Sequence, residues 1–183
     1  MIKRPAAWLL IVTLCAACGH MVAQSPQDSS LPAPTGNPHQ LFYLQRTPDA
    51  NTVVYELNYL NGTLNTLEPI HAFWIRYSEN GQRTELNALQ KKFAYGIKAK
   101  PIAADVFQLQ FVANRSLVMY LRKGADDKYY VYATINQKQV MLKRIFLQIN
   151  GGSFWAPKIA YAELSGIDPD AGITVRERIR VND

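Results

Sequence analysis

PIHAFWIRYSENGQRTELNALQKKFAYGIKAK (residues 69–100) is the stretch around which the rest of the chain is organised. Residues 69–77 alternate as a strand does, with successive side chains pointing to opposite faces. The residues of 78–81, SENG, are typical of a turn, and the alternation returns near residue 93. The stretch therefore predicts a strand, a turn, a short helix and a return strand.

The same stretch holds the one convincing helical pattern in the chain. Leu86, Leu89 and Phe93 recur at i, i+3 and i+7 and form one apolar stripe. Thr84 can serve as the N-cap, and Glu85 then lies in the first turn, where a negative charge favours the helix dipole. We predict a short amphipathic helix over about residues 85–93 that covers an end or an open edge of the sheet.

Outside this stretch the chain is a series of strand-like runs separated by turn residues. The runs recur about every ten residues, helical spacing occurs once, and no βαβ rhythm or internal repeat is present. This pattern predicts a mainly β, antiparallel meander of about nine or ten strands. We expect a single domain over residues 41–183, closed as a barrel or folded as a sandwich.

The first 23 residues have the pattern of an export signal. Lys3 and Arg4 form a positive region, and an apolar run over residues 6–17 is followed by small residues. The run is too short for a transmembrane helix. Two processing routes remain open, cleavage near Ala23 and lipid modification of Cys18. We expect an exported protein, periplasmic or secreted, or alternatively one lipid-anchored in the bacterial envelope.

Composition limits what the mature chain can be. Residues 24–40 are rich in Pro, Ser and Gln, which predicts a disordered linker. Both cysteines, Cys15 and Cys18, lie in the signal, so the mature domain has no thiol for a disulfide, a metal site or a nucleophile. The formal net charge of +6 is modest. We expect no nucleic-acid partner, and membrane contact only through Cys18.

No motif in the sequence predicts catalysis. The patterns GxSxG, HExxH, GxGxxG and the P-loop are absent. His71 is the only histidine inside the predicted domain, and a hydrogen-bonded structural role is its simplest interpretation. The alternative is a general base paired with a carboxylate such as Glu85; Glu79 and Asp105 also flank the central stretch. We predict no catalytic residue, no metal and no cofactor.

Two groups of residues are candidates for binding. The 10 Tyr, 7 Phe and 3 Trp could line a ligand pocket, although aromatic residues at strand spacing are more often part of the core. A pocket closed by the helix would be contacted by His71, Trp74, Leu86, Leu89, Phe93 and Tyr95.

The last strand carries alternating arginines. Arg176, Arg178 and Arg180 share one face of this strand and could contact an anion or an acidic partner. The simpler interpretation is that charges on an edge strand discourage edge-to-edge aggregation.

Several segments together resemble a known family. They are LFYLQRTPDANTVVYELNY (41–59), PIHAFWIRYSENG (69–81), ELNALQKKFAYGIKAK (85–100), IFLQI (145–149) and IAYAELSGID (159–168), with the turn at Ala171-Gly172. The set resembles an uncharacterised family of exported bacterial proteins, domain of unknown function 4833, over about residues 38–181. The family has no assigned activity, cofactor or catalytic residues. The resemblance therefore implies one exported domain and transfers no site.

These observations favour an exported cell-envelope protein with a non-catalytic binding or structural β domain. Its expected partner is a small apolar ligand or another envelope protein. The alternative is an envelope hydrolase that uses His71 and a nearby carboxylate.

Overall fold

The computed structural model describes residues 31–153 and 156–180. These residues form one compact unit. The predicted export signal and Cys18 lie outside the described residues, as do residues 24–30 of the predicted linker. Among the described residues, no helix combines the length and the apolar character needed to cross a membrane.

Within the described residues, thirteen strands and three short helical segments follow one another. The strands are β1 (Gln40–Arg46), β2 (Thr52–Leu57), β3 (Tyr59–Leu60), β4 (Thr63–Leu64), β5 (Ile70–Arg76), β6 (Gln82–Glu85), β7 (Ile97–Ala103), β8 (Val106–Phe111), β9 (Val118–Lys123), β10 (Tyr129–Ile135), β11 (Lys138–Gly152), β12 (Pro157–Ile167) and β13 (Thr174–Arg180). A 3₁₀ turn covers Tyr77–Glu79, and the helix α1 (Ala88–Gln90) runs directly into a π-helical turn, Lys91–Tyr95.

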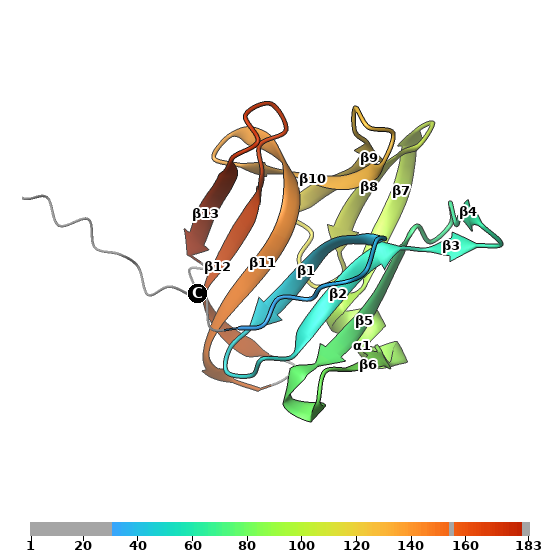
Figure 1. Cartoon of the computed structure of the whole chain (residues 1–183). Helices are drawn as coiled ribbons and strands as arrows, with labels where there is room; N and C mark the ends of the chain where they lie inside the picture. The colour runs from blue at the N-terminus through green and yellow to red at the C-terminus, as the bar shows by residue number, and fades with distance from the viewer. Residues whose placement is uncertain (1–30, 154–155, 181–183) are drawn as a thin grey trace, which may run out of the picture. The chain divides into compact units, whose positions relative to one another are not determined.

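Eleven of these strands form one sheet that curls into a half-barrel (Figure 1). The order is β6-β5-β2-β1-β11-β10-β9-β8-β7, and β12 and β13 follow from the other edge of β11. The remaining pair, β3 and β4, forms a separate hairpin that projects from the sheet (Figure 1). The predicted fold class, mainly β with antiparallel pairing and one short helix, is confirmed.

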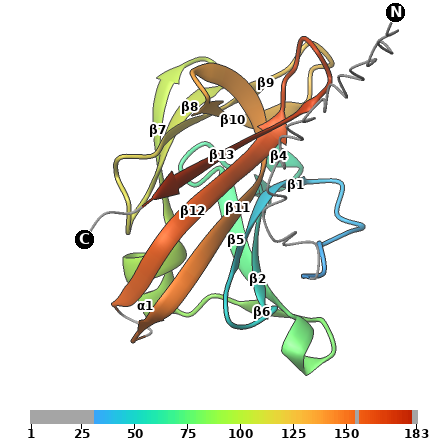
Figure 2. The same ribbon diagram turned by 90° about the vertical axis from the view of Figure 1, so that its left-hand side faces the viewer.

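One strand pair departs from antiparallel pairing and from the order of a simple meander. β1 runs parallel to β11 through residues 43–46 and 144–147. β11 has 15 residues, so its first part can pair with β10 while its middle pairs with β1 and its other edge pairs with β12. The long strand β11 thus joins two smaller meanders into one sheet (Figure 2).

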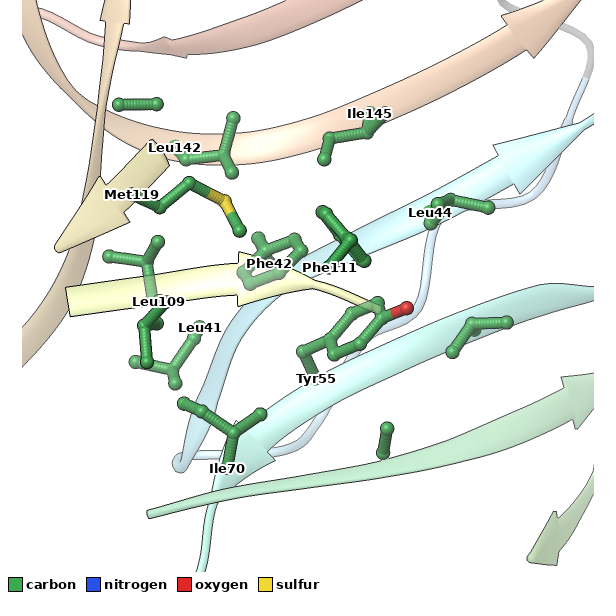
Figure 3. Close-up of a cluster of buried hydrophobic side chains, with 14 of the residues drawn as sticks. Leu41, Phe42, Leu44, Tyr55, Ile70, Leu109, Phe111, Met119, Leu142 and Ile145 are labelled. Carbon is green, nitrogen blue, oxygen red and sulfur yellow. The ribbon is translucent and has the colours of Figure 1, made fainter. Parts of the chain in front are cut away.

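The core lies inside the curl, where side chains of the two meanders meet (Figure 3). Phe42 on β1 stacks on Tyr55 of β2 with ring centres 4.5 Å apart. Phe111 of β8 meets both rings edge-on, at 6.3 Å and 5.7 Å. Edge-to-face and stacked pairs add about 0.5–1.5 kcal/mol each beyond the burial of their area. This aromatic cluster therefore holds the two halves of the sheet together.

The helix begins later than its sequence pattern indicates. Asn87 is the N-cap: its side chain accepts from the backbone N–H of Gln90, and the Gln90 side chain accepts from the N–H of Asn87. Thr84, the expected N-cap, instead pairs with Trp74 in the β5–β6 hairpin. Asparagine is among the best N-cap residues, and glutamine three positions on completes a capping box. The Asn87–Gln90 pair therefore sets the start of the helix.

The described part of the predicted linker contacts the sheet. The side-chain amide of Gln45 donates to the carbonyl of Pro32 (2.8 Å), and the N–H of Leu57 donates to the carbonyl of His39 (3.0 Å). The side chain of Asn37 donates to Glu56. Residues 31–39 are thus held along β1 and β2.

Candidate functional site

An apolar groove of about 390 Å³ opens at one side of the half-barrel. Its lining comes from β1, β8, β11, β12, β13, the β8–β9 loop and the end of the helix. Among the described lining residues, eleven are apolar and three carry polar groups, namely Tyr95 through its phenol, Asn114 and Ser116. We call this cavity the apolar groove.

The register of three strands explains why the groove is apolar and hollow. Leu147 of β11 lies opposite Ala162 of β12, and Ala162 lies opposite Ile179 of β13. Two residues further along the same two strands, Ile145 lies opposite Leu164. Neighbouring strands place these side chains on the same face, so they form a continuous apolar surface. Because Ala162 contributes only a methyl group between two large side chains, the surface is hollowed there.

Tyr95, at the end of the helix, forms one wall of the groove. The Tyr55 hydroxyl donates to the carbonyl of Tyr95 at 3.0 Å, and Trp74 meets the Tyr95 ring edge-on at 5.0 Å. Burial raises the pKa of the Tyr55 phenol well above its usual value, and burial also raises the pKa of Tyr95. Both phenols therefore stay uncharged beside the groove at neutral pH.

A second cavity, of about 670 Å³, lies beside the β3–β4 hairpin. Its lining includes Asn37 and His39 from the N-terminal arm, Glu56 from β2, Tyr59 from the hairpin, His71 from β5 and Arg83 from β6. We call it the polar cleft. It shares no lining residue with the apolar groove.

His71 lies between two carboxylates at the floor of this cleft. Its Nδ1 is 2.9 Å from Oε1 of Glu56, and its Nε2 is 2.8 Å from Oε2 of Glu85. Arg83 donates to the same Oε1 of Glu56 at 2.7 Å, and Lys91 Nζ is 3.8 Å from Glu85. His71 and Glu85, which the sequence suggested as a pair, are therefore in contact. Glu56, which the sequence did not single out, also contacts His71.

Glu56 is the anchor of this network. Partial burial acts to raise its pKa, but hydrogen bonds from His71, Asn37 and Arg83 outweigh burial and hold the pKa below its usual value. Its side chain is only 12% exposed, whereas that of Glu85 is 56% exposed. Both ring nitrogens of His71 are engaged, so an incoming group could reach the imidazole only by displacing a carboxylate. Glu85 is the more accessible of the two.

The model of a domain of unknown function (DUF4833) matches residues 42–178, which is more than half of the chain. The chain belongs to the DUF4833 family. No curated protein and no solved structure matches the chain. Of the residues that line the polar cleft, Glu56, His71 and Arg83 lie inside the region matched by the DUF4833 model. Asn37 and His39 precede that region.

The residues predicted to contact a ligand do not share one site in this DUF4833 domain. Tyr95 lines the apolar groove, and His71 lines the polar cleft. Trp74 and Leu86 are buried in the core, 5% and 4% exposed.

Leu89 and Phe93, the rest of the expected apolar stripe, are 54% and 55% exposed. Leu86 precedes the helix, and the turn that contains Phe93 is π-helical, so these residues do not follow one α-helical repeat.

The three arginines of the last strand are all exposed. Arg178 pairs with Glu163 of β12 at 2.9 Å and lies 4.1 Å from the centre of the Tyr161 ring. The side chain of Asn136 donates to the carbonyl of Arg176 at 3.0 Å. Contact of these arginines with an anion or a partner stays a prediction.

No metal site is visible among residues 31–153 and 156–180, because no three His, Cys, Asp or Glu residues there form a group that could hold an ion. Sequence reasoning missed every described lining residue of the cleft except His71, including Asn37, His39, Glu56, Tyr59 and Arg83. One signal could have found Glu56: it lies directly opposite His71 in the antiparallel pair of β2 and β5.

Proposed function

We propose that this DUF4833 domain is a non-catalytic binding domain of the bacterial cell envelope whose apolar groove holds the apolar part of a small ligand. The observation that supports this function is the hollow around Ala162, which is walled by Leu147, Ile179 and Tyr95. Export is inferred from the signal-like pattern of the first 23 residues.

Two physical features favour this role. Ligand sites in proteins are typically clefts of roughly 300–1,000 Å³ with mostly apolar walls and a few polar groups, and the groove fits that description at about 390 Å³. Two of its three polar residues lie in the β8–β9 loop, where the hydroxyl of Ser116 donates to Asn114 at 2.6 Å. An alkyl chain in the groove would gain about 0.8 kcal/mol for each CH₂ removed from water. The ligand class is therefore a single apolar chain with a polar end.

A fluorescence titration with dansyl-labelled undecanoic acid tests this function. We expect saturable binding to the wild type and none to Ala162→Phe, whose ring would fill the hollow. Ala125→Phe, on the exposed β9–β10 turn, is the matched control and should bind as the wild type does. Equal binding by all three proteins, or no binding by any, would contradict the proposal. Circular dichroism establishes that both variants are folded.

The second candidate function is that of an envelope hydrolase. It is favoured by His71, whose two ring nitrogens lie 2.9 Å and 2.8 Å from the carboxylates of Glu56 and Glu85. If substrate displaced the exposed Glu85, His71 could take a proton from an attacking water, and Glu56 would stabilise the resulting imidazolium. Turnover of p-nitrophenyl acetate by the wild type, lost in His71→Gln, would support this function. A rate unchanged by that substitution would exclude it for this substrate class.

A further inference from the structure

The polar cleft differs from the apolar groove in place and in chemistry. It lies between the projecting β3–β4 hairpin and the outer side of β2, β5 and β6, and its lining mixes charged, amide and aromatic side chains. At about 670 Å³ it is the larger of the two cavities. The ligand of the polar cleft therefore has to be inferred separately from that of the apolar groove.

The charges in the cleft favour an uncharged ligand. Glu56 and Arg83 are the carboxylate and the guanidinium of its lining, and they are bonded to each other at 2.7 Å. An anion would meet the carboxylate of Glu56, and a cation would meet the guanidinium of Arg83. Glu56 already accepts from His71, Arg83 and Asn37, which leaves it poorly suited to hold a metal ion.

The hairpin gives the cleft an aromatic wall. Tyr59 is 41% exposed, and its ring centre lies 5.0 Å from that of His39. The hairpin is held in place by Asn58, whose side chain donates to the carbonyl of Glu68 and whose N–H donates to that of Pro69. An exposed, fixed aromatic ring adds little to the core, but it offers a flat apolar face at low entropic cost.

The floor of the cleft supplies both kinds of hydrogen-bonding group. Glu56 is an acceptor held in one orientation by three donors. The Arg83 guanidinium lies 3.6 Å from the centre of the Phe73 ring, and its hydrogen bonds to described residues use Nη2 alone. Because a guanidinium has five N–H donors, Nε and Nη1 keep donors for a ligand.

We propose that the polar cleft binds a saccharide. The apolar C–H face of a sugar ring would stack on Tyr59, and its hydroxyls would accept from Arg83 and donate to Glu56. A sugar is uncharged, has one apolar face and carries paired donors and acceptors, which is the combination that this cleft presents. The proposal depends neither on the apolar groove nor on turnover by His71.

Isothermal titration calorimetry of the full chain tests the proposal with three probes: the trimer of N-acetylglucosamine, maltotriose and xylotriose. We expect at least one to bind. Tyr59→Ala should weaken that binding by roughly tenfold through loss of stacking, whereas Tyr59→Phe should keep most of it. Leu60→Ala is the matched control, because Leu60 is 60% exposed on the same hairpin and does not line the cleft.

Four results would overturn the proposal. The first is that none of the trisaccharides binds at millimolar concentration. The second is that binding is unchanged by Tyr59→Ala. The third is that inorganic phosphate or trialanine binds in a Tyr59-dependent way and the sugars do not, which would assign the cleft to an anion or a peptide. A loss of sugar binding in Ala162→Phe would place the sugar in the apolar groove and would also count against the cleft.

Discussion

Replacing Tyr55 by phenylalanine should destabilise the domain by removing one hydroxyl and nothing else. Tyr55 is fully buried, and its hydroxyl donates to the backbone carbonyl of Tyr95 at 3.0 Å. The ring can keep its stacking on Phe42, so no large cavity opens. The carbonyl of Tyr95 loses its partner in a buried setting, which costs about 1–3 kcal/mol. For a domain of this size we expect the melting temperature to fall by about 2–4 °C for each kcal/mol.

Urea denaturation, followed by the fluorescence of Trp74 and the other tryptophans, measures this loss. Tyr129→Phe is the control, because its hydroxyl donates to Asp105 at 2.7 Å in an exposed setting. Removing an exposed bond should change the free energy of unfolding by no more than about 0.5 kcal/mol. Equal losses in the two variants, or an unchanged Tyr55→Phe protein, would refute the reasoning that burial of this hydroxyl sets its contribution.

Three further changes have expected outcomes. The pKa of Glu56 is lower in the folded chain than the ordinary 4.5, so its contribution to stability is present above pH 4.5 and is lost as the pH falls through the folded value. Glu56→Gln should therefore make the free energy of unfolding less dependent on pH on the acid side. An unchanged dependence on pH would contradict this. Asn87→Ala removes a capping box and should cost about 1 kcal/mol in urea denaturation, with no loss counting against the cap. Arg176→Val with Arg180→Val should raise self-association in light scattering, since β13 is an edge strand; a variant that stays monomeric would contradict the protective role.

Local pattern was enough to predict most of the strands and the presence of the helix, because each depends on neighbouring residues. It did not predict β6, where a turn and the start of the helix were expected. The alternation in 69–77 corresponds to β5 and the 3₁₀ turn that follows it, and the stripe near residue 90 does mark a helix. The position of the cap was missed because Thr84 and Asn87 are both acceptable N-caps. The choice between them is made by Gln90, which bonds Asn87, and by pairing of residues 82–85 with β5.

The two cavities could not be predicted in the same way, because they depend on long-range pairing. The apolar groove requires Leu147, Ala162 and Ile179 to stand side by side on three strands, and no local pattern specifies that register. The parallel pairing of β1 with β11 joins residues about a hundred positions apart. His71 was noticed from its residue type, whereas its carboxylate partner Glu56 became visible only once β2 and β5 were paired.

Native mass spectrometry of the protein purified from its own host tests the central claim, ligand binding in the apolar groove, most directly. The wild type should carry an added mass that organic extraction removes and identifies as a molecule with an apolar chain. Ala162→Phe, expressed and purified in parallel, should lack it, while Ala125→Phe should retain it. A wild type of unmodified mass, or an added mass that persists in Ala162→Phe, would contradict the account.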